Sequence, residues 1–563
     1  MKKGCEKYIP FEPVELKNRQ WPNNKIEKHP IWCSVDLRDG NQALIDPMNL
    51  EEKLEMFKLL CDIGIKEIEV GFPSASETEY EILRELIEGG HIPDDVTIQV
   101  LVQAREHLIK RTFEAIDGAK NVIVHFYNST SKLQRKVVFR QDMEGVKKIA
   151  IEGAKLIKAL GDEAAAKTDC NIRYEYSPES FMGTEMDYAV DVCHGVMEVL
   201  GSSKEDKIIL NLPTTVESSP PNWFADQIEY FCSKLPNREA AIISLHPHND
   251  RGTAVATAEL GLLAGADRVE GTLFGNGERT GNLDIITLAL NMYTQAIDPG
   301  LDFSEINRIK EIYERTTDMI VPVRHPYAGE LVFTAFSGSH QDAINKGEAY
   351  MKNSGTEYWE VPYLPIDPAD IGRAYEPIIR INSQSGKGGV AFIMSNVFGY
   401  DLPKAMHPDF ARVVKEYSDK VGREVRADEV MDLFKSEYID NGEPYKLTAN
   451  KFYDEGENGE ECPRARFEGK LKCNGNEPVD ITGRGNGPID AFFQALSTVG
   501  ISGYKFVNYA EHAISVGSDA KAVSYIQLET PEGETVFGVG ISHNINYASI
   551  RGILCAINRS LKK

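Results

Sequence analysis

Short apolar runs rich in β-branched residues recur between residues 31 and 274, and amphipathic stretches separate them. The separating stretches, such as 49–64 and 253–266, carry apolar residues at helical spacing. Strands that alternate with helices predict a parallel sheet, and this number of units favours a closed (β/α)8 TIM barrel of the α/β class. An open doubly wound sheet is the alternative, but no G-x-G-x-x-G follows the first run. The eight runs are 31–36, 67–72, 97–102, 121–126, 171–176, 207–212, 242–245 and 268–274.

The pattern changes three times along the chain, which predicts four segments. We expect an N-terminal extension at 1–30, the barrel at 31–329, helical linker subdomains at 330–440 and a separate α+β domain at 441–563. Pro-rich and Gly-rich turns mark the linker region.

The last segment carries an internal correspondence at a constant offset, which favours a duplicated strand-strand-helix unit. Coincidental amphipathicity is the alternative. The residues Val479, Gly483, Ala491 and Leu496 correspond to Val536, Gly540, Ala548 and Ile553.

Composition excludes several classes of protein. Of the 563 residues, 42% are hydrophobic and 26% charged, as in ordinary globular proteins. A net charge of −24 argues against a nucleic-acid partner, which needs a basic surface. The nine cysteines form no C-x-x-C pair, which indicates a reducing compartment. No signal peptide or long apolar segment is visible, so we expect a cytoplasmic protein without a membrane partner.

The sequence HPHND ends the seventh apolar run with two histidines. Residues i and i+2 of a strand point to the same side, so His246 and His248 can bind one metal ion together. Asp39, after the first run, is the best carboxylate partner, and such a set leaves coordination positions open for substrate. The alternative is that the histidines only form hydrogen bonds at the barrel mouth.

Other polar residues gather where the predicted strands end, which is where barrel enzymes carry their active sites. Beside Asp39, Arg38 can stabilise negative charge that develops on a substrate oxygen, or it can form a simple salt bridge. The glycine-rich stretch 271–282 lacks the ending of a phosphate loop, and Glu278 and Asn282 within it can support the metal site. Further residues at these ends are Glu69, His125, Ser177, Glu179, Thr215, Glu217 and Asn276.

These motifs resemble the 2-isopropylmalate synthase and homocitrate synthase family of Claisen-condensing barrel enzymes. The resemblance covers nearly the whole chain and favours the longer form of the isopropylmalate branch. The stretches that carry it are DLRDGNQ (36–42), SPESFMGTE (177–185), NLPTTVE (211–217), HPHNDRGTAVA (246–256), GTLFGNGERTGN (271–282), FSGSHQDAI (336–344), VPYLPIDPADIGRAYE (361–376), GRGNGPIDAF (483–492) and YAEHAIS (509–515).

The resemblance implies condensation of acetyl-CoA with 2-oxoisovalerate and hydrolysis of the thioester to give 2-isopropylmalate and CoA, the first step of leucine biosynthesis. It implies that the barrel at 31–329 is catalytic and that the domain at 441–563 is regulatory. It also implies a homodimer, a divalent ion (magnesium, manganese or zinc) and a monovalent activator such as potassium. The metal would lie on Asp39, His246 and His248, with Asn282 nearby and Glu278 behind them. The implied substrate-binding residues are Arg38, His125, Ser177, Glu179 and Thr215.

Two residues outside the predicted barrel gain a catalytic role only through the resemblance. His340 would be donated by the partner subunit, and Tyr363 corresponds to a tyrosine implicated in catalysis. Arg38 and Glu179 complete the implied catalytic set.

The C-terminal segment would bind leucine as a feedback inhibitor. The implied pocket positions are small residues, namely Gly485, Gly487, Ala513 and Ala520. A neighbouring position that is commonly small in the family is Asp490 here, which leaves the affinity and identity of the effector open.

Four other functions compete with this reading. A sister synthase that makes homocitrate or citramalate would share the chemistry and differ only in its 2-oxo acid. An acyl-CoA lyase would share the barrel and the two histidines, and the resemblance implies a cysteine in the glycine-rich loop of such lyases. The stretch 271–282 contains no cysteine, which disfavours this reading. A non-haem iron oxygenase would be expected on an all-β fold with an H-x-D pair. The last alternative is a binding barrel without catalytic activity.

Overall fold

The computed structural model describes residues 3–335, 337–375, 387–421, 425–439, 441–455, 465–514 and 520–562. The chain forms two compact units. The first contains Met1–Phe333 and Pro365–Ala374, and the second contains Thr334–Leu364 and Tyr375–Lys563. Residues of the predicted linker region therefore contribute to both units.

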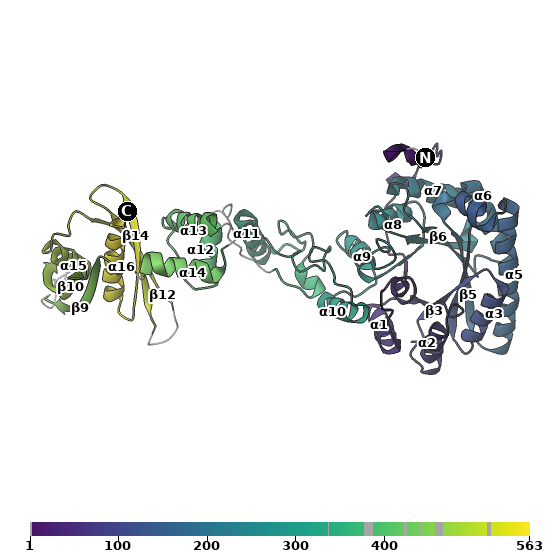
Figure 1. Cartoon of the computed structure of the whole chain (residues 1–563), viewed down its shortest axis with the longest axis horizontal. Helices are drawn as coiled ribbons and strands as arrows, with labels where there is room; N and C mark the ends of the chain where they lie inside the picture. Colours follow the sequence, from purple (N-terminus) through teal and green to yellow (C-terminus); the bar gives the residue numbers. More distant parts are fainter. Residues whose placement is uncertain are drawn as a thin grey trace. The chain divides into compact units, whose positions relative to one another are not determined.

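The first unit confirms the predicted fold class, because eight parallel strands close into a barrel in the order of the sequence. Helices surround the strands, as the barrel in Figure 1 shows. The strands are β1 (Ile31–Ser34), β2 (Glu67–Gly71), β3 (Thr97–Gln103), β4 (Asn121–Ser129), β5 (Asn171–Glu179), β6 (Ile208–Thr214), β7 (Ala241–Pro247) and β8 (Arg268–Gly271). Each predicted run contains or overlaps one of them.

Local sequence signals set the ends of the barrel helices. Helix α1 (Leu50–Ile63) begins with a capping box between Asn49 and Glu52 and ends at Gly64, whose φ of 108° suits a residue without a side chain. The remaining helices of this unit are α2 (Glu77–Glu88), α3 (Glu106–Ala115), α4 (Lys132–Gln134), α5 (Met143–Lys167), α6 (Met186–Leu200), α7 (Pro221–Lys234), α8 (Ala254–Leu263), α9 (Ile285–Tyr293) and α10 (Ile306–Thr317).

In its described residues, the second unit contains two small antiparallel sheets, each followed by a helix, and four further helices that precede them in the chain. The preceding helices are α11 (Gly338–Ser354), α12 (Lys387–Asn396), α13 (His407–Val421) and α14 (Ala427–Phe434). Phe410, Val414 and Phe434 from α13 and α14 share a hydrophobic core with Tyr525 and Val539 of the second sheet. This core makes the helices part of the same compact unit as the sheet.

The duplication predicted from the sequence corresponds to two repeats of the same architecture within the second unit. Each repeat has three strands and a helix, whereas the sequence predicted two strands and a helix. The sequence does not predict the third strand because β9 and β12 are edge strands that contain no buried residue and no continuous apolar run. The first repeat contains β9 (Tyr445–Asp454), β10 (Ala465–Cys473), β11 (Val479–Gly485) and α15 (Pro488–Ser497). The second contains β12 (Lys505–Ala513), β13 (Ala522–Glu529), β14 (Thr535–Ser542) and α16 (Ile545–Ser560).

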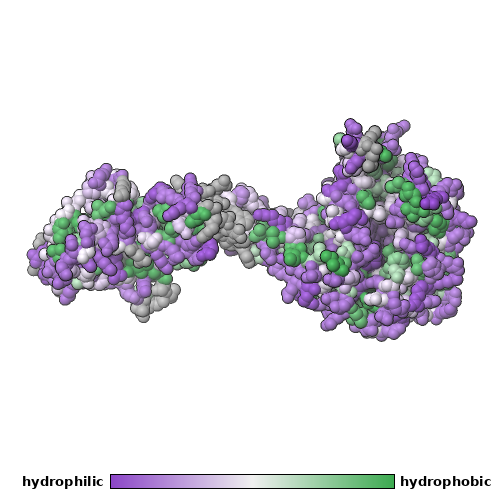
Figure 2. Space-filling view, viewed as in Figure 1, coloured by the Kyte–Doolittle hydropathy of each residue, from purple (hydrophilic) through white to green (hydrophobic). Residues whose placement is uncertain are grey.

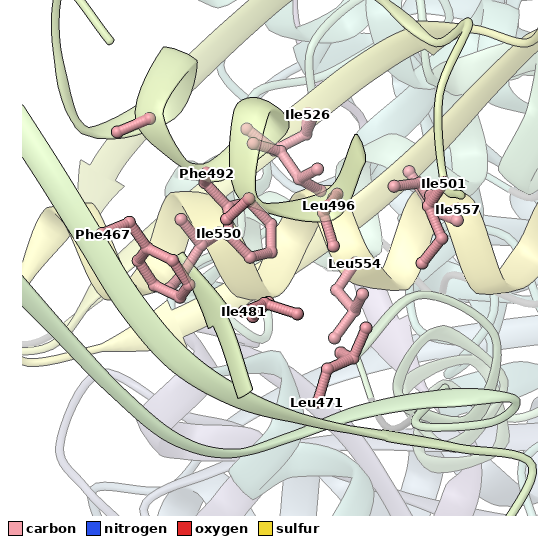
Figure 3. Close-up of a cluster of buried hydrophobic side chains, with 14 of the residues drawn as sticks. Phe467, Leu471, Ile481, Phe492, Leu496, Ile501, Ile526, Ile550, Leu554 and Ile557 are labelled. Atoms are coloured by element: carbon pink, nitrogen blue, oxygen red, sulfur yellow. The ribbon is translucent and has the colours of Figure 1, made fainter. Parts of the chain in front are cut away.

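The two repeats pack their helices and sheets around one apolar core. Figure 3 shows Phe467, Ile481 and Phe492 of the first repeat in the same cluster as Ile526 and Ile550 of the second. Matching glycines allow each helix to lie directly on its own sheet, because a Cβ on Gly483 would lie 2.3 Å from the carbonyl oxygen of Ala491. A Cβ on Gly540 would lie 1.9 Å from that of Ala548.

The surface of both units is mostly hydrophilic on the face that Figure 2 shows, with apolar residues in small patches. Among the described residues, none of the helices combines the length and the apolar character that a bilayer-spanning segment needs.

The close approach at Gly540 yields the first prediction. Gly540→Ala should destabilise the second unit by about 3 kcal/mol or more, because backbone atoms of α16 cannot yield to the methyl group. Gly442→Ala is the matched control, since a Cβ there meets nothing within 4 Å. Thermal unfolding of both variants measures the difference, and equal unfolding temperatures would contradict the packing described here.

Candidate metal and substrate site

Three side chains meet at the C-terminal mouth of the barrel, where strands β1 and β7 end. The potential ligand atoms of Asp39, His246 and His248 all lie within 4.8 Å of one another, and all three residues are buried. His246 Nε2 lies 3.3 Å and His248 Nε2 lies 3.8 Å from Asp39 Oδ2. The structure therefore brings together the three residues that the sequence predicts as metal ligands.

This donor set fits a divalent ion. Two imidazoles and a carboxylate are ligands that transition metals and zinc accept. Two buried polar atoms at the site, Nδ1 of His248 and Oδ1 of Asn282, have no hydrogen-bond partner among the described residues. Since buried polar atoms are normally satisfied, these two atoms support a site that binds a further group.

The histidines differ electrostatically. Burial opposes the charged form of His246, but its hydrogen bonds to Asp39 and Glu270 outweigh burial and raise its pKa to about 9. Burial and the neighbouring charge of His246 together lower the pKa of His248 to about 3. Although burial raises the pKa of Asp39, Arg38 and the histidines outweigh it, so the net pKa lies well below its ordinary value.

Glu270 of β8 orients His246 from behind. Its Oε2 lies 2.6 Å from Nδ1 of His246, which leaves Nε2 facing Asp39. A carboxylate in this position fixes the tautomer and ring orientation of a ligating histidine. Glu270 was not among the site residues predicted from the sequence. Arg268 and Glu270 stand at i and i+2 in an apolar run, and this spacing indicates two charged side chains on the same face of the strand.

Arg38 connects the metal cluster with the next strands. Its Nη1 donates to Asp39 Oδ1 at 2.6 Å, and its Nε donates to Glu69. Glu69 Oε2 lies 2.8 Å from Nδ1 of His125, whose Nε2 lies 2.8 Å from Ser177 Oγ. Burial disfavours the charged form of Glu69, but Arg38 and His125 outweigh it and lower its pKa. Arg38, His125 and Ser177 thus belong to one buried network.

A second layer of charged side chains fills the barrel interior below this network. Glu175 is fully buried, and neither of its carboxyl oxygens has a hydrogen-bond partner among the described residues. Burial first, and the negative charge of Glu270 second, raise the pKa of Glu175 well above its ordinary value, despite the nearby Arg268. Burial and the charge of Glu270 thus favour the protonated form of Glu175.

A cavity of about 790 Å³ opens onto this site, and all the residues that line it belong to the first unit. Its lining includes the metal cluster and most of the residues expected to bind substrate. The predicted site residues on its wall are Arg38, Asp39, His125, Ser177, Glu179, Thr215, His246, His248 and Glu278.

Individual contacts hold several of these wall residues in place. Thr215 Oγ1 accepts from the backbone N–H of Ser180 at 2.9 Å. Burial raises the pKa of Glu179 above its ordinary value. Glu278 is half-exposed at the rim, and Asn282 is buried and donates to the carbonyl oxygen of Asn276 at 3.2 Å.

His340 and Tyr363 belong to the second compact unit. Their rings stack on each other with centroids 4.1 Å apart, and both residues are exposed. The structure therefore pairs the two residues that sequence reasoning placed outside the barrel.

The four predicted effector residues divide between the two repeats. Gly485 ends β11 and Gly487 precedes α15, whereas Ala513 ends β12 and Ala520 precedes β13. A Cβ on Gly485 would lie 2.5 Å from the backbone nitrogen of Ala491, so helix packing already requires this glycine. A Cβ on Gly487 would meet nothing within 4 Å.

Fold and site together define a parallel α/β barrel whose mouth carries a two-histidine, one-carboxylate cluster. Three family models match the chain in succession. HMGL-like matches residues 29–312, "Alpha-isopropylmalate synthase, post-catalytic domain-like" matches 330–395, and "LeuA allosteric (dimerisation) domain" matches 424–561.

Curated relatives are similar along the whole chain. A 2-isopropylmalate synthase of Clostridium acetobutylicum is 58% identical over 99% of this chain and 99% of its own length. The 2-isopropylmalate synthase of Mesorhizobium japonicum is 54% identical over 99% of this chain and 99% of its own length. That of Rhodospirillum rubrum is 53% identical over 98% of this chain and 98% of its own length. The chain belongs to the 2-isopropylmalate synthase family, which confirms the resemblance read from its motifs.

The raised pKa of the buried Glu175 carboxyl gives a prediction about pH. The folded pKa of Glu175 is raised, so its contribution to stability is complete below the unfolded pKa and is lost as pH rises toward the folded pKa. Glu175→Gln imitates the neutral acid and avoids this loss.

The variant should therefore gain stability over the unsubstituted protein by about 1.4 kcal/mol for each pH unit above the unfolded pKa, until the folded carboxyl ionises. Unfolding temperatures measured between pH 6 and pH 9 provide the comparison. A difference that stays constant or shrinks with rising pH would show that Glu175 is ionised in the folded protein.

Proposed function

We propose that the protein condenses acetyl-CoA with 2-oxoisovalerate and hydrolyses the resulting thioester, releasing 2-isopropylmalate and CoA. The observation that carries the proposal is the buried cluster of Asp39, His246 and His248 on the wall of the barrel cavity, in a chain 58% identical to a 2-isopropylmalate synthase. The activity makes the protein an acyltransferase of the leucine pathway.

The metal-binding residues in this proposal are Asp39, His246 and His248, with Asn282 beside them. A divalent ion held by these residues would supply Lewis-acid polarisation of the ketone of a bound 2-oxo acid. The ligand set accepts magnesium, manganese or zinc, and a monovalent ion such as potassium is proposed as an activator.

Arg38 and Glu179 supply charge stabilisation and proton transfer. Arg38 lies on the cavity wall and is held by Asp39 and Glu69, so its guanidinium is oriented before negative charge develops on the substrate ketone oxygen. Glu179 also faces the cavity, and its raised pKa brings it nearer to the range of a general base at neutral pH. We assign it the removal of a proton from the acetyl methyl group.

Thr215 is proposed to bind the carboxylate of the 2-oxo acid, while His125 and Ser177 shape the wall next to it. We propose that the stacked pair of His340 and Tyr363 reaches the site of a second copy of the chain in a homodimer. The match of residues 424–561 to an allosteric dimerisation domain supports this assembly.

The condensation can be followed through the free thiol of CoA. With Mn²⁺ present, acetyl-CoA and 2-oxoisovalerate should release thiol faster than acetyl-CoA with pyruvate or 2-oxoglutarate. Faster release with either of the other two acids would assign the protein to a sister synthase.

His248→Ala should lower kcat/KM on the order of 10³-fold, because the loss of Lewis-acid stabilisation costs about 4 kcal/mol. The matched control is His91→Ala, since His91 is an exposed histidine whose side chain retains 41% of its accessible surface. Unchanged turnover of the His248 variant would contradict the metal assignment.

Leucine is proposed to bind the duplicated domain and to inhibit the enzyme. Ala513→Phe should relieve this inhibition without lowering activity in the absence of leucine, because Ala513 is exposed and a phenyl ring there fills the proposed pocket. Glu532→Phe, at the exposed turn between β13 and β14, is the control that should keep inhibition. Inhibition curves for thiol release measure both, and unaltered inhibition of the Ala513 variant would place the effector elsewhere.

A further inference from the structure

Three loops at the barrel mouth, those that follow β6, β7 and β8, are joined by side chains without a role in the mechanism above. The joining residues are Glu217, Asp250 and Arg279, one from each loop, and we call them the loop clamp. Each of the three loops also carries a residue of the proposed site, namely Thr215, His248 and Asn282.

Asp250 lies at the centre of the loop clamp. Its Oδ1 accepts from Nε of Arg279 at 2.7 Å, and its Oδ2 accepts from Nη2 at 3.1 Å. Oδ2 also accepts from the backbone N–H of Glu217 at 2.9 Å. The side chains of Arg279 and Asp250 are 39% and 17% exposed, and this carboxylate ties the loop after β7 to both of its neighbours at the barrel mouth.

Glu217 returns the contact from the loop after β6. Its carboxylate accepts from the backbone N–H of Arg251 at 2.6 Å and from the hydroxyl groups of Thr253 and Thr257. These donors lie around the start of α8, where unsatisfied backbone N–H groups favour an anion. Glu217 and Asp250 therefore each bind the backbone of the loop that carries the other.

Arg279 completes the link from the loop after β8. Besides its two bonds to Asp250, its Nη2 donates to the carbonyl oxygen of Thr215 at 2.7 Å. Arg279 has a φ of 59°, a left-handed conformation that is unfavourable for a non-glycine residue. The surrounding contacts hold the residue in this conformation, which directs its guanidinium across the two neighbouring loops.

The backbone beside the loop clamp places two residues of the proposed metal site next to each other. His248 and Asn282 face one another in an isolated antiparallel bridge. The N–H of Asn249 donates to Gly281 at 2.9 Å, and the N–H of Leu283 donates to Pro247 at 2.8 Å. Any shift of one loop against the other would therefore move His248 relative to Asn282.

We propose that Asp250 and Arg279 are positioning residues that fix the loops after β7 and β8 so that His248 and Asn282 are arranged to bind a divalent ion. The inference rests on the metal site of the proposed function. Neither residue touches the ion; each acts through the backbone that carries the ligands.

Direct binding of an anionic substrate group by Arg279 is the competing role, since the residue lines the cavity. Two of its three nitrogens already donate to Asp250 and Thr215, while Nη1 lies 3.9 Å from Glu278. Protein acceptors therefore occupy the bidentate face of the guanidinium, and the geometry favours the positioning role.

The test measures Mn²⁺ binding to the metal-free full-length protein by calorimetry. Asp250→Asn and Arg279→Gln should each weaken binding about tenfold, in the range of losses caused by removing outer partners of metal ligands. The double variant should be no weaker than about tenfold, because both substitutions break the same link. Asp94→Asn is the control that should bind normally, since Asp94 forms an exposed pair with Lys120 before β3 and β4 begin.

Other results would overturn the proposal. Unchanged Mn²⁺ affinity with a raised KM for either substrate would assign Arg279 to substrate binding, and a hundredfold loss in the double variant would show that the two residues act independently. If the unsubstituted protein binds no Mn²⁺, the proposed metal site fails and the positioning role fails with it. If it binds tightly and both variants retain that affinity, the positioning role alone is wrong.

Discussion

The guanidinium of Arg268 holds the interior of the barrel together. It is fully buried and donates to Glu67 at 2.6 Å, to Ser244 and Glu270 at 2.8 Å and to Gln99 at 2.7 Å. These partners lie on the strands β2, β3, β7 and β8. The barrel closes where β1 pairs with β8, and β2 and β7 are the outer neighbours of that pair. A charge buried this deeply is tolerated only because carboxylates and amides surround it, and its removal would leave them unpaired.

This ionic interior explains how the metal cluster keeps its shape. Glu270 binds Arg268 with one oxygen and His246 with the other. The same carboxylate therefore links the proposed metal ligand His246 to the charged interior of the barrel. Above this layer, Arg38 bridges Asp39 and Glu69. The proposed ligands are therefore supported from below by rigid strands and from the side by loops that bind one another.

The second unit is stabilised by an apolar core between helices and sheets, whereas charged side chains fill the barrel interior. Its two repeats pack aliphatic and aromatic side chains between helix and sheet, and glycines at equivalent positions in β11 and β14 permit the close contact. Exposed edge strands β9 and β12 remain on the outside of both sheets. A second copy of the chain with a similar domain is a suitable partner for such a surface, in agreement with the proposed homodimer.

The sequence by itself determined the barrel, because the alternation of strand and helix follows from local hydrophobic periodicity. It also indicated the metal cluster, because His246 and His248 share one strand face and Asp39 follows the first strand. It did not show β9 or β12 as strands, the complete burial of Glu175, or the partners of Arg268 and Arg279. Their roles depend on residues far apart in the chain that meet only when the barrel closes, and no local pattern records which charges will be buried together.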